Sequence, residues 1–194
     1  MQRPLHSSQK FGLKLLDYHG GQHTGLYCVG SCLLAGETPP EGQIVRALDE
    51  LKPFISTDPE ARTLRVTLVE YLQLDEFTRA YIEAAFWSTI DDRGGSLDDN
   101  YTLADFAPET LARFAADCAA FQAAHVDDID AGCKKPRSCT DREYAGHDFW
   151  LTRNGHGCGF WDGDWPEEAG ARLTAASKAF GEIDLYVGDG KLYC

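Results

Sequence analysis

The sequence predicts an α+β protein, in which an N-terminal helical segment is followed by helices packed on a small antiparallel sheet made of two hairpins. Two patterns support this fold class. Apolar residues repeat every three or four positions over much of residues 1–128, which is the period of one helix face. Asn154-Gly155 separates two aromatic runs, and alternating apolar residues precede Gly188-Asp189-Gly190, so both segments have the pattern of a β-hairpin.

Residues 1–73 are predicted to form a helical N-terminal region that is divided by glycine and proline. The breaks fall at Gly20-Gly21, Pro39-Pro40 and Pro53. Asp58-Pro59 then predicts a new helix start. An aspartate before a helix can accept the free backbone N–H groups of the first turn, and proline fits the first helical position.

Residues 74–194 are predicted to form a C-terminal α+β domain. Its expected elements are helices 74–90 and 107–128, hairpin 147–162, helix 166–180 and hairpin 183–193. Helix 166–180 has a proline near its first turn, acidic residues that suit the positive end of the helix dipole, and a glycine after its last residue. In helix 107–128, His125 continues the apolar stripe, so we interpret it as a partly buried histidine rather than a ligand or a base.

Three segments of the chain carry a resemblance to a known family. They are Ala145–Asp162 (AGHDFWLTRNGHGCGFWD), Tyr81–Ser88 (YIEAAFWS) and Leu97–Phe106 (LDDNYTLADF). Over about Asp75 to Tyr193, the chain resembles a family of small proteins encoded by bacteriophages and prophages. The resemblance implies no catalytic or binding residues. It implies a context, namely an accessory protein that is made inside a bacterium.

Negative charge is the compositional feature with the most functional content. The formal net charge is −13, and residues 91–130 hold ten carboxylates but only two arginines. Such a surface repels nucleic acid and attracts basic protein grooves, with association accelerated by electrostatic steering. An acidic face can also serve solubility alone, and charge by itself leaves that interpretation open.

Together with the phage resemblance, the charge predicts an anti-defence protein of anti-CRISPR or anti-restriction type. We expect a stoichiometric inhibitor that binds a host protein with a basic surface, such as a nucleic-acid-binding defence complex, by presenting carboxylates in place of phosphates. The predicted partner-binding residues are Asp91, Asp92, Asp98, Asp99, Asp127, Asp128, Asp130, Trp150 and Trp161. Direct nucleic-acid contact is not expected, because the basic segment 133–142 is isolated within an acidic half.

Two other classes of function stay open. The first is a phage structural or replication accessory protein that forms a homo-oligomer through the aromatic hairpin, with Trp150, Trp161 and Trp165 at the interface. The second is a small enzyme that uses His147 or His156 with Cys158 or nearby aspartates. Strand alternation would place His147 among apolar residues and far from His156, and no helix start or lysine adjoins Cys158 to activate its thiol, which disfavours the enzyme.

Neither a metal nor another cofactor is expected. The chain has seven cysteines, an odd number, and a reducing compartment disfavours structural disulfides. Cys28 and Cys32 have no second pair at zinc-finger spacing, although a site that joins them to His19 and His23 stays open. No stretch approaches the roughly 20 apolar residues of a transmembrane helix, and no apolar signal region is evident, so we expect a cytoplasmic protein without membrane contact.

Overall fold

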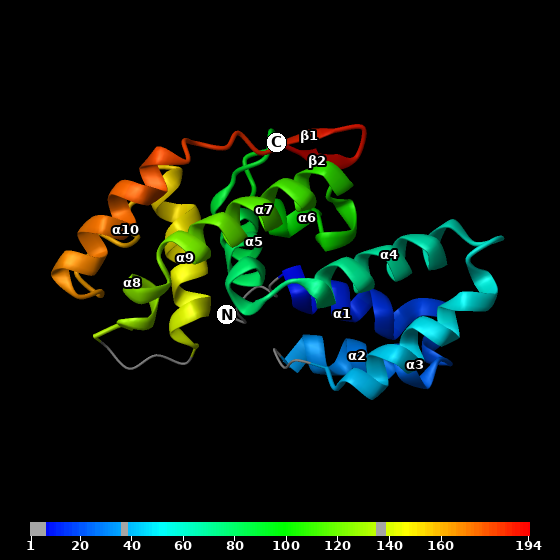
Figure 1. The fold of residues 1–194 in the computed structure, drawn as a ribbon. Coiled ribbons are helices and arrows are strands. Elements are labelled where there is room, and N and C mark those ends of the chain that lie inside the picture. Colours follow the sequence, from blue (N-terminus) through cyan, green and yellow to red (C-terminus); the bar gives the residue numbers. More distant parts are fainter. Residues whose placement is uncertain (1–6, 36–38, 135–138) are drawn as a thin grey trace, which may run out of the picture. The chain divides into compact units, whose positions relative to one another are not determined.

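A computed structural model describes residues 7–35, 39–134 and 139–194, which form a mostly helical chain with one two-stranded antiparallel sheet (Figure 1). The chain divides into two compact units. The first contains Met1–Gln73 and Asp98–Asp105, and the second contains Leu74–Leu97 and Phe106–Cys194. Residues 98–105, which the sequence analysis assigned to the C-terminal domain, therefore belong to the first unit.

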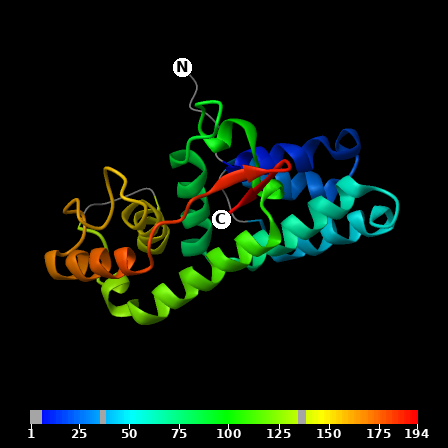
Figure 2. The same cartoon turned by 90° about the horizontal axis from the view of Figure 1, so that it is seen from above.

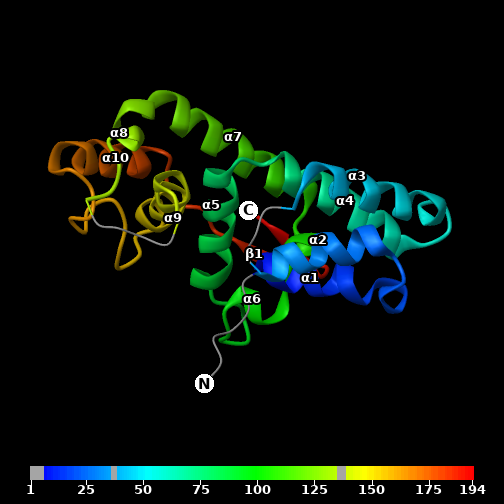
Figure 3. The same ribbon diagram turned by 90° about the horizontal axis from the view of Figure 1, so that it is seen from below.

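The first unit is built from helices joined by short 3-10 turns. Its elements are α1 (Ser7–Asp17), η1 (Tyr18–Gly21), α2 (Thr24–Ala35), α3 (Glu41–Leu51), η2 (Lys52–Phe54), α4 (Pro59–Gln73) and η3 (Leu103–Asp105). The prediction for Asp58 is confirmed, because its carboxylate accepts the backbone N–H of Glu60 at 2.9 Å where α4 begins. In Figure 3, α2 lies beside α1 and also packs against α3.

Close packing within the first unit depends on glycine and on one acidic side chain. A Cβ on Gly12 would lie 2.6 Å from the carbonyl oxygen of Gly30, so only glycine allows α1 and α2 to approach this closely. The Glu50 carboxylate of α3 accepts the backbone N–H groups of Gly25 at 2.9 Å and Leu26 at 3.1 Å. These N–H groups lie in the first turn of α2, where no partner within that helix is available to them.

The second unit contains the longer helices and the small sheet. Its elements are α5 (Glu76–Ser88), α7 (Pro108–Ala124), α8 (Val126–Asp130), α9 (Asp141–Arg153), α10 (Glu167–Ala179), β1 (Tyr186–Gly188) and β2 (Lys191–Tyr193); α6 (Leu97–Asn100) begins in this unit and continues into the first. The central helix is α9, which packs against both α5 and α10 (Figure 2).

Aromatic side chains fill the core around α9. The rings of Phe149 and Phe121 stack with their centroids 4.0 Å apart, and the ring of Tyr81 meets Trp150 edge to face at 5.2 Å. All four side chains are buried. Aromatic pairs of this kind each contribute about 0.5–1.5 kcal/mol beyond the burial of their apolar surface, so these contacts stabilise the packing of α9 against α5 and α7.

The predicted hairpin 147–162 is wrong. Residues 141–153 form α9, and residues 154–165 form an irregular loop, which we call the groove loop. The helix begins with a capping box in which Thr140 Oγ1 accepts the Glu143 N–H at 3.1 Å and the Glu143 carboxylate accepts the Thr140 N–H at 2.7 Å. Asn154 and Gly155, the latter with φ 68°, end the helix, so this Asn-Gly pair is a helix stop rather than a hairpin turn.

The second predicted hairpin, 183–193, forms only over its last eight residues. Tyr186 pairs with Tyr193 across a turn at Asp189-Gly190, where both residues have positive φ, as a two-residue hairpin requires. The helices do not pack on a sheet of two hairpins. Instead β2 lies against the start of α7, where the carbonyl oxygen of Leu192 accepts the Ala107 N–H at 3.0 Å.

Helices form within the three ranges that the sequence predicted for this unit. Ranges 74–90 and 166–180 correspond to α5 and α10, but range 107–128 is divided at His125, which separates α7 from α8. The interpretation of His125 as partly buried is confirmed, since about a quarter of its side chain is exposed and its ring lies 5.1 Å from that of Phe121. Within the described part of the chain, no helix is both long enough and apolar enough to cross a lipid bilayer.

Candidate functional site

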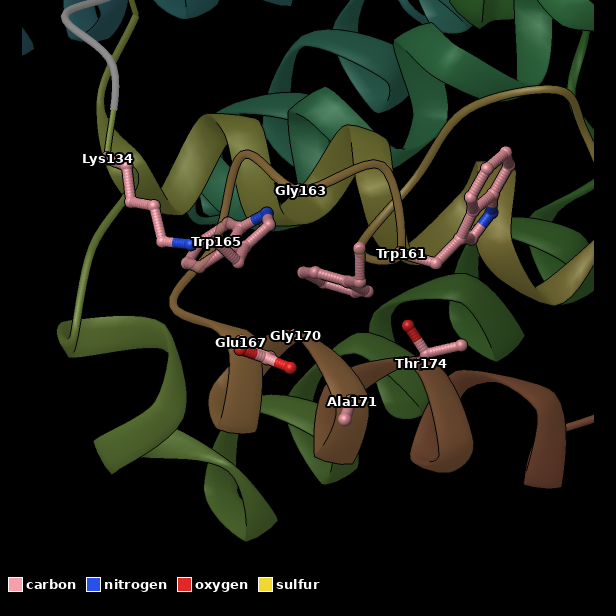
Figure 4. A pocket seen from close by; sticks show the side chains of 9 residues that line it. Lys134, Trp161, Gly163, Trp165, Glu167, Gly170, Ala171 and Thr174 are labelled. Atoms are coloured by element: carbon pink, nitrogen blue, oxygen red, sulfur yellow. The ribbon is translucent and has the colours of Figure 1, made fainter.

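A groove of about 580 Å³ lies on the second unit, between the groove loop and one face of α10 (Figure 4). We call it the aromatic groove. It is lined by Lys134, Phe160, Trp161, Gly163, Trp165, Glu167, Gly170, Ala171 and Thr174. In Figure 4 the two tryptophans and Lys134 stand along the loop side, and Glu167, Ala171 and Thr174 face them from α10.

Two buried hydrogen bonds from α9 hold the loop wall of this groove. Thr152 Oγ1 accepts the backbone N–H of Phe160 at 3.0 Å, and Asp148 Oδ2 accepts the indole N–H of Trp165 at 2.7 Å. The side chains of Phe160 and Trp165 are consequently fixed in the interior. Trp161, next to the first of these anchors, is 54% exposed.

The opposite wall depends on a glycine of α10. A Cβ on Gly170 would lie 2.7 Å from the carbonyl oxygen of Phe160 and 3.3 Å from Cβ of Trp165. Any larger residue would push α10 away from the loop, because real Cβ atoms essentially never come within 3.0 Å of a backbone atom. Gly170 therefore lets α10 lie directly against the loop at Phe160, and Ala171 adds only a methyl group to this wall.

The surroundings of the groove are acidic. Residues 160–170 contain four acidic side chains and no lysine or arginine. Glu167 is exposed in the first turn of α10, and Glu168 is 91% exposed with one oxygen 3.8 Å from Arg172. Among the described lining residues, Lys134 carries the one positive charge. A cation that approached the groove would therefore meet a net negative field.

Two of the predicted acidic residues, Asp91 and Asp98, are largely withdrawn from solvent. The Asp91 carboxylate accepts the backbone N–H groups of Arg93 at 2.9 Å and Gly95 at 3.1 Å, and the residue is only 9% exposed. Asp98 is 7% exposed. Neither carboxylate presents a free surface to a partner. Asp92 and Asp99 are exposed, but they belong to different compact units.

Internal pairing also removes two of the three predicted aspartates of α8. Arg172 donates two hydrogen bonds to Asp128 Oδ1, at 2.6 and 3.0 Å, and Arg142 donates one to Asp130 at 2.6 Å. The Arg172 guanidinium holds the pKa of the Asp128 carboxyl below its ordinary value. Asp127 is exposed. Within the part of the chain that the structure describes, it forms no ion pair.

The two predicted tryptophan contacts lie in opposite environments. Trp150 is 1% exposed and its indole N–H donates to Ser88 Oγ at 2.8 Å, so it belongs to the core and cannot touch a partner in the folded state. Trp165 is buried as well. An interface built from Trp150, Trp161 and Trp165 together is therefore wrong, and of these three only Trp161 presents its ring to solvent.

The residues of the enzyme alternative lie on two different elements. His147 lies within α9, and His156 and Cys158 lie in the groove loop. Burial, Asp148 and Asp162 raise the pKa of the Cys158 thiol, which opposes formation of a nucleophilic thiolate. Burial lowers the pKa of His156. These shifts favour a neutral thiol and a neutral imidazole at neutral pH.

The structure describes three of the four side chains of the alternative metal site near the N-terminus, namely those of His23, Cys28 and Cys32. The ring of His23 packs between Tyr18 and Phe54, with centroid distances of 5.8 and 5.6 Å, and the side chain of His19 lies outside the described residues. Across the described ranges, no group of three or more potential metal-ligating side chains is found. In the described part of the chain, the cysteines are not joined by disulfide bonds. Residues 135–138 of the basic segment 133–142 also lie outside the described ranges.

Sequence reasoning missed the wall of the groove that α10 forms, and it missed Arg153, which joins α9 to the end of α10. Arg153 donates to Asp117 at 2.9 Å, to the Tyr81 hydroxyl at 2.8 Å, and to the carbonyl oxygens of Phe180 at 3.0 Å and Gly181 at 2.8 Å. No short sequence motif predicts a residue with this set of long-range partners. The capping box Thr140-x-x-Glu143 was a legible signal for the start of α9, and it lies just outside the segment on which the hairpin prediction was based.

Comparison of the chain with protein-family models, with curated proteins and with solved structures finds no match.

Proposed function

We propose that the protein is a phage-type anti-defence protein, of the anti-CRISPR or anti-restriction class, that inhibits a host defence complex stoichiometrically by binding its basic surface. The observation that carries the proposal is a group of exposed carboxylates on adjoining elements of the second unit. Asp127 lies on α8, Asp162 on the groove loop and Glu167 on α10. Helix α8 packs against α10, and the loop and α10 line the same groove.

The structure narrows the set of acidic residues that this proposal uses. Asp128 and Asp130 are engaged with arginines, and Asp91 and Asp98 are largely buried. The proposed surface is therefore centred on α8 and the start of α10 rather than on residues 91–100. Asp162, Glu167 and Glu168 join Asp127 there, although the sequence analysis did not include these three.

Exposed carboxylates suit this task for two reasons. Their collective field accelerates encounter with a basic protein and repels the nucleic acid that competes for the same partner. Each carboxylate can also accept two hydrogen bonds from an arginine of the partner, as a phosphate does. A protein with these properties occupies a nucleic-acid groove without any chemical step.

The test is a plaquing assay in bacteria that carry defined CRISPR or restriction systems. Expression of the protein should restore plaquing of a targeted phage under at least one system and should co-purify a subunit of that system in a fixed ratio. The variant Asp127→Lys with Asp162→Lys should lose both effects. Its control is Glu182→Lys with Asp184→Lys, which makes the same charge change at two other exposed residues of the second unit. Unchanged plaquing under every system tested, or equal loss in both double variants, would contradict the proposal.

A further inference from the structure

We infer that the aromatic groove receives an extended, arginine-containing segment of a protein partner, with one guanidinium packed against Trp161. The inference rests on the proposed function only in identifying that segment as part of a defence complex. Its chemistry follows from the groove, which combines an exposed indole, an acidic rim and a wall without bulky side chains.

The shape of the groove suits a segment of chain. Its volume of about 580 Å³ lies within the range of roughly 300–1,000 Å³ that is usual for binding pockets. In Figure 4 the lining residues extend along α10 from Glu167 to Thr174, which is two turns of the helix. An extended chain can follow such a course and place alternate side chains on the two walls.

Trp161 has the properties of an anchor. Tryptophan is the side chain that attracts cations most strongly through its ring face, and arginine stacks on it as a flat group. Its neighbours Phe160 and Trp165 are fixed by hydrogen bonds to α9, so the loop that presents the indole is already ordered before a partner arrives. A pre-ordered contact loses less conformational entropy on binding.

Charge selects the occupant. Glu167 lines the wall opposite Trp161, and the exposed Asp162 follows Trp161 in the chain. Lys134 is the one basic residue among the described lining residues, so the four carboxylates of residues 160–170 outnumber it. Nucleic acid is repelled by the same charges. A second copy of this chain is also disfavoured, because each copy carries a formal charge of −13. A basic protein segment is the occupant that satisfies both the indole and the carboxylates.

Thr174 offers a place for a hydrogen bond from the occupant. In the described part of the chain, its hydroxyl oxygen is enclosed and has no hydrogen-bond partner. Figure 4 shows that this oxygen points toward the groove loop. A buried hydroxyl without a partner destabilises a protein, and an N–H group that lay in the groove would satisfy it after a small rotation of the side chain.

The test is a titration of the full chain, labelled with ¹⁵N, with a blocked hexa-arginine peptide at low salt, followed by NMR. The Trp161 indole N–H and the backbone N–H groups of Gly170 and Ala171 should shift together and reach saturation. Trp161→Ala and Glu167→Lys should each weaken binding about tenfold, as measured on the Ala171 backbone N–H. Glu182→Lys, which makes the same charge change at an exposed residue beyond α10, should change the affinity less than twofold, since a distant exposed charge is screened.

Three outcomes of the peptide titration would overturn the inference. They are the absence of shifts at the groove, an equal loss of affinity in Glu182→Lys, which would indicate diffuse attraction, and equal binding of a blocked hexa-glutamate peptide. Dimer formation through the groove would also overturn the inference, because the occupant would then be a second copy of this chain. Light scattering would detect it as an increase in mass that Trp161→Ala abolishes. If peptide binding behaves as expected while plaquing is never restored, the proposed function fails and the groove assignment stands; the reverse result rejects the groove alone.

Discussion

The aromatic stretch from His147 to Trp165 divides into two halves with opposite roles. In the first half, α9 buries Phe149 and Trp150 among the rings of α5 and α7. In the second half, the groove loop fixes Phe160 and Trp165 but leaves Trp161 half exposed above α10. The two halves have similar composition, so residue type alone does not decide which tryptophan supports the fold and which is free to bind.

Hydrogen-bond anchors account for the difference. The indole N–H groups of Trp150 and Trp165 both donate to buried or half-buried oxygens, those of Ser88 and Asp148. A buried indole needs such a partner, because an unpaired N–H in the interior costs about 1–3 kcal/mol. Mutations in the first half should therefore reduce stability, and a mutation at Trp161 should reduce binding.

The largest effect is expected for Trp150→Ala. The side chain is fully buried and lies 5.2 Å from Tyr81 and 5.8 Å from Phe114, ring centroid to ring centroid. Its removal should lower the free energy of unfolding by about 3–5 kcal/mol, through lost burial and the cavity that remains. Urea unfolding followed by circular dichroism measures this loss. If Trp150→Ala lost less stability than a substitution at an exposed site, α9 would not be the centre of the core.

The next largest effect is expected for Arg153→Met, which leaves Asp117 without its buried partner. The Arg153 side chain is 1% exposed, and its guanidinium joins α9 to the end of α10 through two carbonyl oxygens. Because Asp117 is itself 25% exposed, water can compensate part of the loss, and we expect a decrease of about 3 kcal/mol in the free energy of unfolding. The double variant Arg153→Met with Asp117→Leu should recover some of that stability. A double variant as unstable as the sum of the two singles would show that the pair is not coupled.

A smaller loss of stability is expected for Thr152→Val. Thr152 joins the two halves of the aromatic stretch through its hydrogen bond with Phe160. The valine keeps the shape of the side chain but removes the oxygen that accepts the Phe160 N–H in the interior. The unpaired N–H should lower the free energy of unfolding by about 1–2 kcal/mol. Hydrogen exchange at Phe160 should accelerate by more than the change in global stability predicts, because the anchor of the loop is lost. Exchange that follows global stability alone would contradict the role of Thr152 as that anchor.

The sequence was sufficient for the helices that glycine, proline and caps delimit, and insufficient for α9. Asp58 at the start of α4 and the helix-forming range 166–180 were legible because each end has a chemical cause. Residues 148–153 of α9 are all buried, and three of them are polar, so residue polarity does not mark an exposed face and the helical period disappears. β-forming residues beside Asn-Gly then favoured a hairpin, which tertiary burial and the capping box overrode.

The candidate site was predictable in composition but not in placement. The sequence shows where carboxylates are frequent, yet Asp128 and Asp130 meet their arginines 44 and 12 residues away, and no local pattern reveals those partners. Nothing in the sequence distinguishes Gly170 from another helical glycine. Its role is evident only from the fold, in which the Phe160 carbonyl oxygen leaves no room for a Cβ at this position. Long-range pairing of this kind decides which charges remain free, and it is set by the fold.

The Asp128–Arg172 pair should make stability depend on pH. The folded-state pKa of Asp128 is lowered, so the pair stabilises the fold fully above the ordinary aspartate pKa of about 4, and this contribution disappears as the pH falls through the lowered value. Arg172→Met should therefore be less stable than the natural chain at pH of about 6, by less than Thr152→Val, and the difference should shrink as the pH falls from about 4 through the lowered pKa of Asp128. Parallel stability curves for the two proteins over that range would show that Asp128 does not titrate with this partner.

The smallest effect on stability is expected for Trp161→Ala, and it tests the comparison most directly because the same substitution at Trp150 has the largest. More than half of the Trp161 side chain already contacts water, and none of the described hydrogen bonds of the groove loop uses its indole N–H. The free energy of unfolding should change by less than about 0.5 kcal/mol, as for other exposed substitutions. Affinity for the hexa-arginine peptide should nevertheless fall about tenfold, since the cation then loses the ring face against which it packs. Urea unfolding and peptide titration on the same sample separate the two quantities, and a loss of stability comparable to that of Trp150→Ala would place Trp161 in the core and remove the distinction between the halves.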